Sequence, residues 1–462
     1  MAGNGWTLKS IEELKAPKKG AIAIGPFGSR MKSDCYVPSG VQVIRGTNIS
    51  DTRTLVGEMV CITPKLADQL GNAIVHADDL VFPHRGSIGL VGIVPRNNTE
   101  RYALSSSLMK LTCDRKQVEP LFLFYFFRSA DGKHELLKNA STVGTPGIGQ
   151  PLSSLRSIKV PLPPLAEQKA IAAVLGALDD KIELNRRMNA TLEAMARALF
   201  QSWFVDFDPV RAKLDGRKPI GLDETTAVLF PDSFQDSAVG HIPNGWRVGV
   251  LDELTKFVIG GDWGATESTD DETVSCYCIR GADIPSLQSG GVGKMPTRFL
   301  KPSSVEKRQL ADGDVAIEIS GGSPTQCTGR PVLASDALLQ SLGQPLVASN
   351  FCRILKLKSP ALSKFVYLWL RQLYDAGELF QFETGTTGIK NFAFVIFSER
   401  YPLVVPDLRV AEAFDRALSP LFARIQANSK ESRTLATLRD TLLPKLLSGE
   451  LSVVEDEKEG CV

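Results

Sequence analysis

The stretch that decides the fold runs from Leu165 to Val205 and reads LAEQKAIAAVLGALDDKIELNRRMNATLEAMARALFQSWFV. Its apolar residues recur in alternating steps of 4 and 3, which is the a/d spacing of a coiled coil. Adding 243 to each number gives a second seam with the same steps within residues 408–449. The two predicted seams consist of Ile171, Leu175, Leu178, Ile182, Asn185, Asn189, Leu192, Ala196 and Leu199, and of Phe414, Leu418, Leu421, Ile425, Asn428, Ser432, Leu435, Arg439 and Leu442.

The duplication extends to the sequence around these helices. Arg45–Ile49 is echoed by Arg280–Ile284, and Asp78–Phe82 is echoed by Asp312–Ala316. Proline-rich segments precede both helices, and they end a domain because proline cannot continue into a helix interior. The predicted order is a domain at 1–164, a long helix at 165–205, a connector at 206–242, a second domain at 243–407, a second long helix at 408–449, and an acidic, disordered tail at 450–462.

Short β-branched runs separated by Gly, Asn and Pro turns predict an α+β class, with two tandem mixed α/β domains. A helix of about 41 residues spans about 60 Å, too long to bury its seam against its own domain. We therefore expect the two helices to form an antiparallel coiled coil, with the domains related by a pseudo-two-fold axis. Asn185 and Asn428 either form a register-fixing polar pair in the seam or mark an exposed polar break.

Composition places the chain among ordinary globular proteins, since 43% of its 462 residues are hydrophobic and 23% are charged. No apolar run reaches the roughly 18 residues of a membrane span, and no secretory signal is visible. The eight cysteines are scattered without a CxxC pair, so we expect reduced thiols in a cytoplasmic protein. Formal charge is +7 over residues 1–164 and −2 over residues 243–407, which permits binding to a polyanion without requiring it.

Catalytic and metal-binding motifs are missing from the sequence. It contains no GxxxxGK[ST] or GxGxxG loop, no HExxH, no GxSxG and no Asn/Asp-Pro-Pro-aromatic motif. The four histidines, at positions 76, 84, 134 and 241, are far apart and have no cysteine pair beside them. We expect no catalytic residues, no metal site and no cofactor in this chain, and a binding or scaffold role is favoured.

Several further motifs follow one another along nearly the whole chain. They are Gly25–Ser29, Arg45–Ile49, Pro161–Ile171, Leu178–Ile182, Trp203–Val210, Phe230–Phe234 and Ile242–Trp246. This combination resembles the type I restriction–modification specificity subunits. The second half departs from the pattern, because Leu408–Glu412 replaces the Leu-Ala-Glu-Gln signature of the first.

The resemblance implies that each half holds a target-recognition domain for one part of a split, asymmetric DNA site. It implies that the coiled coil acts as a ruler for the unread spacer and docks two methyltransferase subunits, which motor and endonuclease subunits then join. S-adenosylmethionine, ATP and Mg²⁺ are expected on those partners, whose assembled complex would be an adenine methyltransferase and ATP-dependent endonuclease. Double-stranded DNA is the expected ligand, and no membrane partner is expected.

DNA readout requires Arg, Lys, Asn or Gln on exposed loops, with further basic or hydroxyl side chains on phosphates. Arg45 and Arg280 occupy the same place in both halves, which favours a scaffold or phosphate role over base specificity. The candidates are Arg30, Lys32, Arg45, Asn48, Arg85, Ser87, Thr142 and Thr145 in the first domain, and Arg280, Arg298, Ser320, Thr325, Arg330, Thr384, Thr386 and Lys390 in the second.

Two other functions compete with DNA recognition. The chain could be a coiled-coil scaffold or adaptor whose two domains bind proteins. It could also be a fused nuclease or methyltransferase, which the missing motifs disfavour. Affinity for duplex DNA that falls steeply with salt would distinguish the DNA reader from the adaptor.

Overall fold

The computed structural model describes residues 6–26, 30–97, 99–141, 144–321, 326–385 and 389–453. The chain divides into two compact units, which we call the first unit (Met1–Glu183 with Arg433–Val462) and the second unit (Leu184–Ser432). Both long helices, α6 (Leu165–Phe204) and α15 (Leu408–Ser448), contribute to both units. The predicted tail falls mostly on residues 454–462, which lie outside the described part.

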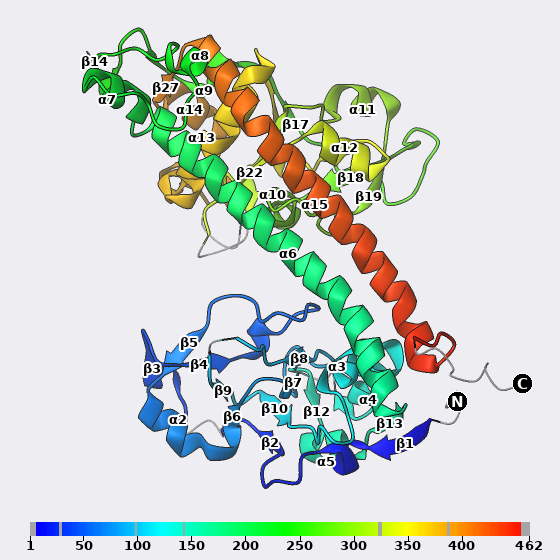
Figure 1. Cartoon of the computed structure of the whole chain (residues 1–462). Coiled ribbons are helices and arrows are strands. Elements are labelled where there is room, and N and C mark those ends of the chain that lie inside the picture. The colour runs from blue at the N-terminus through cyan, green and yellow to red at the C-terminus, as the bar shows by residue number, and fades with distance from the viewer. Residues whose placement is uncertain are drawn as a thin grey trace, which may run out of the picture. The chain divides into compact units, whose positions relative to one another are not determined.

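Within each unit, a segment of α6 packs antiparallel against a segment of α15 (Figure 1). In the first unit Asp179 on α6 pairs with Arg439 on α15, and Ile171 shares a core with Leu446. In the second unit the rings of Phe200 and Phe414 lie 6.2 Å apart between centroids. Residue numbers rise on one helix as they fall on the other, so the predicted antiparallel coiled coil is confirmed.

The seam positions are buried or half-buried along both helices. Ile171, Leu175, Ala196, Phe414, Leu418 and Ile425 are buried. The remaining apolar positions are half-buried, namely Leu178, Ile182, Leu192, Leu199, Leu421, Leu435 and Leu442.

A buried polar layer interrupts the seam of the second unit. Asn185 and Asn428 are 0% and 1% exposed, so the interpretation as an exposed polar break is wrong. Asn185 Nδ2 donates to Asn428 O at 3.2 Å, and Asn428 Nδ2 donates to Asn189 Oδ1 at 2.9 Å. Asn189 Nδ2 in turn donates to Ser429 Oγ at 3.0 Å. Because a shift along the helices would leave these groups unpaired, the layer favours one register.

The first unit is built from small, mostly antiparallel sheets. Strand β4 (Val41–Ile44) pairs parallel with β9 (Tyr102–Leu104), while the other pairs among the described strands of this unit are antiparallel. The sheets are β2-β10-β7-β8 (Ile22–Ile24, Leu108–Leu111, Leu80–Pro83, Gly92–Ile93), β3-β5-β4-β9-β6 (Tyr36–Val37, Val60–Ile62, Val41–Ile44, Tyr102–Leu104, Ile74–Val75), β1-β13 (Thr7–Ser10, Lys159–Leu162) and β11-β12 (Ala140–Ser141, Gly147–Ile148). Its shorter helices are α1 (Ile11–Leu14), α2 (Pro64–Leu70), α3 (Pro120–Arg128), α4 (Ala130–Leu137) and α5 (Pro151–Ser157).

The second unit repeats this topology. A four-stranded sheet, a sheet with one parallel pair and a small sheet beside a loop recur in the same chain order. The sheets are β17-β24-β20-β22 (Thr255–Gly260, Cys352–Leu357, Val315–Glu318, Pro331–Leu333), β19-β18-β23 (Thr297–Leu300, Val274–Ile279, Leu346–Ala348), β16-β27 (Arg247–Gly249, Leu403–Val405) and β21-β26-β25 (Ser320–Gly321, Lys390–Phe392, Glu383–Thr384). The helices of its globular part are α9 (Leu251–Leu254), α10 (Ile284–Gln288), α11 (Pro302–Arg308), α12 (Asp336–Leu342), α13 (Ser363–Asp375) and α14 (Phe394–Arg400).

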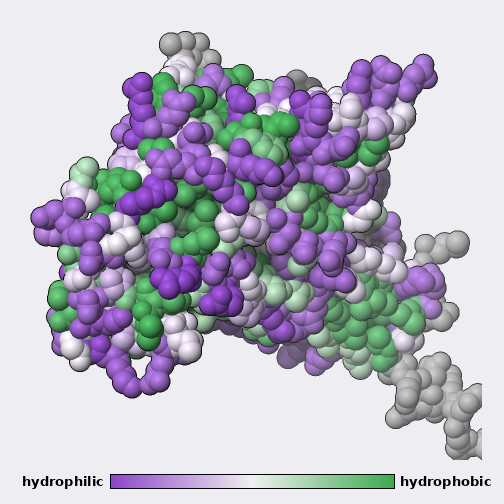
Figure 2. Space-filling view, turned by 90° about the horizontal axis from the view of Figure 1, so that it is seen from above, coloured by the Kyte–Doolittle hydropathy of each residue, from purple (hydrophilic) through white to green (hydrophobic). Residues whose placement is uncertain are grey.

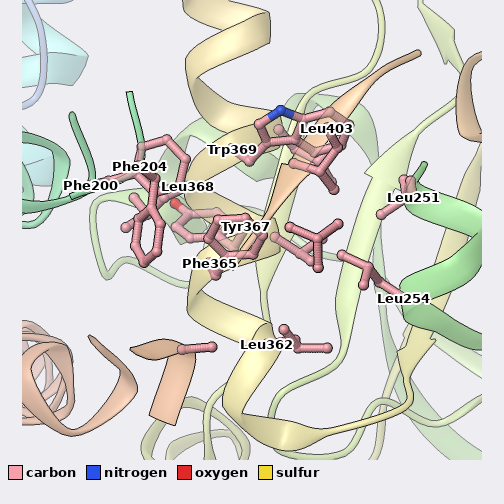
Figure 3. Packing of buried hydrophobic residues seen from close by; sticks show 14 of the residues in the cluster. Phe200, Phe204, Leu251, Leu254, Leu362, Phe365, Tyr367, Leu368, Trp369 and Leu403 are labelled. Carbon is pink, nitrogen blue, oxygen red and sulfur yellow. The ribbon is translucent and has the colours of Figure 1, made fainter. Parts of the chain in front are cut away.

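The predicted connector is folded and joins the core of the second unit. It contains α7 (Asp208–Leu214), α8 (Glu224–Ala227) and the hairpin β14-β15 (Phe234–Ser237, Gly240–Pro243). Its Phe207 and Phe230 rings pack on Trp246, and Phe230 also meets Trp203 edge to face at 5.1 Å. Figure 3 shows the neighbouring part of this core, where Phe200 and Phe204 of α6 lie beside Phe365.

Gln168 anchors the start of α6 to the first unit. Its side chain is fully buried, and Oε1 accepts a hydrogen bond from Glu119 N at 2.9 Å. Nε2 donates to Pro163 O at 2.8 Å and to Gln117 O at 3.2 Å. At the corresponding position of the second helix the sequence has Ala411, also buried, so the amide bridge belongs to the first unit alone.

Replacing Gln168 with Ala should lower the free energy of unfolding of the first unit by about 2 kcal/mol, because the Glu119 N–H and the carbonyls of Pro163 and Gln117 lose their hydrogen bonds to the buried amide. Hydrogen exchange of peptides from residues 115–175 would report the change. Lys169→Ala, at the exposed neighbouring position, is the matched control. Equal protection in the two variants would contradict this role of Gln168.

Three further features concern membrane spans, the surface and the cysteines. Among the described residues, no helix is long and apolar enough to cross a membrane. Figure 2 shows a face on which hydrophilic side chains predominate and hydrophobic ones form separate groups. The seven cysteines that the structure describes are free thiols.

Candidate nucleic-acid interface

Two loops of the first unit lie side by side and carry three of its candidate residues. Gly86 N donates to Pro146 O at 2.8 Å, and Ile148 N donates to His84 O at 2.9 Å. These bonds bring the loop after β7 against the hairpin β11-β12. Arg85, Ser87 and Thr145 are exposed on the resulting surface, which we call the first loop cluster (84–89, 139–141 and 144–149).

The second unit assembles the same arrangement from β21, β25 and β26. Ser320 pairs with Asn391, and Phe392 N donates to Ile319 O at 2.8 Å. The candidates Ser320, Thr384 and Lys390 therefore lie together. We call this surface the second loop cluster (319–321, 351, 380–385 and 389–392).

The two clusters can be aligned through their backbone hydrogen bonds. His84 N donates to Ser107 O in the first unit, as Ile319 N donates to Phe351 O in the second. Behind each cluster a glycine allows close backbone approach. A Cβ on Gly25 would lie 1.9 Å from Ser105 O, and one on Gly261 would lie 2.0 Å from Ser349 O. The scaffold of the two clusters is thus the same, whereas the exposed side chains differ.

The charge of the first cluster comes from Arg85. Burial lowers the pKa of His84, so its ring is neutral near pH 7 and Nε2 donates to Ser106 O at 3.0 Å. Arg85 stays exposed beside it and can reach a phosphate or a base edge.

The charges of the second cluster are paired. Lys390 Nζ lies 2.9 Å from Glu383 Oε2 and 5.1 Å from the centroid of the Phe380 ring. Glu383 Oε1 accepts a hydrogen bond from Thr328 N at 2.6 Å. The carboxylate of Glu383, which the sequence analysis did not single out, therefore ties three segments together and positions Lys390.

Arg45 and Arg280 have equivalent structural contacts. Each precedes a short 3₁₀ helix, Gly46–Asn48 or Gly281–Asp283. Arg45 Nη2 donates to Glu58 O at 3.0 Å, and Arg280 Nη2 donates to Lys294 O at 2.7 Å. Each arginine holds the same turn in its own unit, which gives a structural reason for its recurrence.

Asn48 is not the exposed loop residue that the sequence predicted. It is 1% exposed, and Nδ2 donates to Val56 O at 2.8 Å and to Glu58 O at 3.2 Å. Its Oδ1 accepts a bond from Arg45 N at 2.9 Å. The sequence could not distinguish a turn-capping amide from a base-reading amide, since both require Asn near a loop.

The other candidates occupy separate places. Arg30 and Lys32 are exposed before β3. Arg298 lies over the Trp263 ring at 4.0 Å, and Arg330 donates to Tyr374 Oη at 2.7 Å through Nη2. The remaining candidates, Thr142, Thr325 and Thr386, lie outside the described residues.

No metal centre is found in the described ranges, where no three His, Cys, Asp or Glu side chains gather in a suitable group.

Comparisons with known proteins bear on this arrangement. A family model described as the type I restriction modification DNA specificity domain matches residues 28–194. The specificity subunit of the type I restriction enzyme HindI from Haemophilus influenzae is 25% identical over 398 residues, which cover 77% of this chain and 82% of that protein. A Methanocaldococcus jannaschii protein provisionally named the MjaX specificity subunit is 32% identical over 425 residues, covering 90% of this chain and 88% of its own length.

A solved structure shares the fold. The crystal structure of the S subunit of a type I restriction–modification system from M. genitalium gives a TM-score of 0.54 at 15% identity, covering 96% of this chain and 97% of that one. The duplicated topology and the sequence relatives define a DNA specificity protein. The chain belongs to the specificity subunits of type I restriction–modification systems. Members of this family recognise DNA sequence and have no catalytic activity of their own.

Proposed function

We propose that this chain reads a bipartite, asymmetric DNA site, with one loop cluster on each half. The observation that carries the proposal is that two clusters with matching backbone hydrogen bonds carry different side chains, which are exposed or half-buried. Arg85 and Thr145 occur in one, and Ser320 and Ile389 occur at the corresponding positions of the other. A common scaffold with different side chains suits two different half-sites.

The domain assignment follows from this proposal. Residues 1–164 and 243–407 are the target-recognition domains, and α6 with α15 is the spacer between the sites that they read. The coiled coil docks two methyltransferase subunits, and motor and endonuclease subunits join that complex. S-adenosylmethionine, ATP and Mg²⁺ belong to these partners, and the complex acts on double-stranded DNA in the cytoplasm.

Footprinting of the complex reconstituted with its methyltransferase subunit tests the bipartite site. We expect two short protected elements about one helical turn apart, with affinity that falls steeply with salt. One continuous protected element would contradict the bipartite proposal. Salt-insensitive binding, or no DNA binding by the complex, would favour the protein-binding adaptor instead.

Replacing Arg85 with Ala should weaken binding by about tenfold and affect protection of one half-site only, because one guanidinium contact in a groove is worth about 1–3 kcal/mol. Lys65→Ala, which removes an exposed charge of α2 outside the cluster, is the control. If both variants lowered affinity equally at both half-sites, Arg85 would be contributing only general attraction to DNA.

A further inference from the structure

Three large apolar side chains are exposed in the second loop cluster. Phe351 is 50% exposed, Phe380 is 44% exposed and Ile389 is 57% exposed. Each of them adjoins a polar contact of the cluster: Lys390 Nζ lies 5.1 Å from the centroid of the Phe380 ring, Ile389 directly precedes Lys390, and the Phe351 carbonyl accepts a hydrogen bond from Ile319 N. Exposed apolar side chains that gather around polar groups mark interaction surfaces more often than isolated ones do.

The first loop cluster has polar side chains at two of the corresponding positions. Ser107 corresponds to Phe351, because each carbonyl accepts the equivalent strand-end hydrogen bond. Thr145 corresponds to Ile389. Thr145 lies two residues before Gly147, which pairs with Arg85, and Ile389 lies two residues before Asn391, which pairs with Ser320. The same backbone bonds form with Ser and Thr, so the apolar side chains are not needed to hold the loops.

The apolar character of the second cluster therefore points to its ligand. The major groove presents one apolar group that distinguishes bases, the C5-methyl group of thymine, and aliphatic and aromatic side chains contact it. Ser320, Thr384 and Lys390 belong to the same cluster, because Ser320 and Thr384 both pair with Asn391, the neighbour of Lys390, and their hydroxyl and ammonium groups suit polar contacts to the DNA backbone. Arg85 and Thr145 in the first cluster suit hydrogen bonding instead.

We propose that the second loop cluster reads at least one thymine through its C5-methyl group, with Ile389 as the contacting side chain and Phe351 and Phe380 excluding water beside it. This inference rests on the proposed function and names the chemistry of one half-site. It assigns Ile389 as a specificity-determining residue of the second unit.

The test uses the reconstituted complex and duplexes in which each thymine of the site is replaced in turn by deoxyuridine, which lacks only the methyl group. The half-site whose protection Arg85→Ala lowers is assigned to the first unit. In the other half-site, at least one replacement should weaken binding about fourfold, the affinity equivalent of burying one methyl-sized group. Ile389→Ser should bind the thymine duplex more weakly and lose this sensitivity to deoxyuridine.

Val395→Ser is the matched control, because Val395 is 56% exposed on α14 and lies outside the cluster. It should keep both the affinity and the deoxyuridine effect. The inference is overturned if the second half-site lacks thymine on both strands, if the wild type binds deoxyuridine duplexes equally well, or if Ile389→Ser keeps the full effect. Weaker assembly of Ile389→Ser with the methyltransferase subunit in the absence of DNA would also overturn it, in favour of a protein contact. Failure of the proposed function itself would differ, since no duplex would then bind specifically.

Discussion

Removing residues 180–186 from α6 together with residues 429–435 from α15 should shorten the preferred spacer by about three base pairs and leave both half-sites unchanged. Seven residues of helix span about 10.5 Å, and duplex DNA rises about 3.4 Å per base pair. Seven is one full period of the 4-and-3 seam, so both apolar faces keep their phase. Methylated adenines mapped in cells carrying the variant would give the new spacer directly.

The paired deletion keeps important contacts on either side of the cut. Asp179 and Arg439 both lie on one side of the two deleted segments, and Asn189 and Asn428 both lie on the other side. Each pair therefore stays in contact after the deletion. A deletion from α6 alone is the control, since it shifts one helix past the other and should abolish specific methylation. A paired deletion that alters the recognised bases and keeps the spacer would contradict the ruler.

Replacing Asp179 with Ala should cost the first unit about 3–5 kcal/mol, the loss expected when one partner of a buried ion pair is removed. Asp179 is 6% exposed at its side chain, and it accepts bonds from Arg439 Nη1 at 2.6 Å and Tyr125 Oη at 2.8 Å. Arg128 Nη1 lies 3.4 Å away. The substitution leaves two largely buried guanidinium groups without this carboxylate.

Tyr125 reinforces the effect. Its burial, together with the nearby charge of Asp179, raises the pKa of the phenol, so the hydroxyl is protonated and remains a donor near pH 7. Without Asp179 that donor is also buried and unpaired.

Asp180→Ala is the matched control for this prediction. The Asp180 side chain is 62% exposed and pairs with Arg53 at the surface, where an ion pair contributes about 0–1 kcal/mol. Calorimetry and hydrogen exchange of peptides from α3 would measure both variants. If the two substitutions destabilised the first unit equally, the buried charge cluster would have no special role.

The sequence predicted the class and the long helices because their signals are periodic and local. The seam repeats over some 30 residues, and prolines mark where each helix begins. The seam pattern placed Asn185, Asn189, Asn428 and Ser432 at the helix interface, but it could not show which of these side chains bond to one another. Asn189, Ser429 and Ser432 became neighbours only when the antiparallel register was known.

The candidate site was harder to predict because its residues come together through long-range strand pairing. Arg85 and Thr145 are 60 positions apart, and their loops are brought together by the bridge between Arg85 and Gly147 and by the backbone hydrogen bonds of Gly86 and Ile148. Asn48 was misplaced because burial depends on tertiary packing that a short motif does not encode. Gln168 stood in the quoted family motif, yet its role depended on Glu119 and Gln117, which no local pattern links to it.

The division of the chain into units has a consequence for how such proteins can change. The first unit holds both chain ends, whereas the second is one continuous segment, Leu184–Ser432, inserted into it. Both borders fall inside α6 and α15, next to the layer of asparagine and serine side chains. A gene segment encoding this insert could be replaced as a cassette through two in-frame helical junctions. Such an exchange would give the chain a new second half-site in a single recombination event.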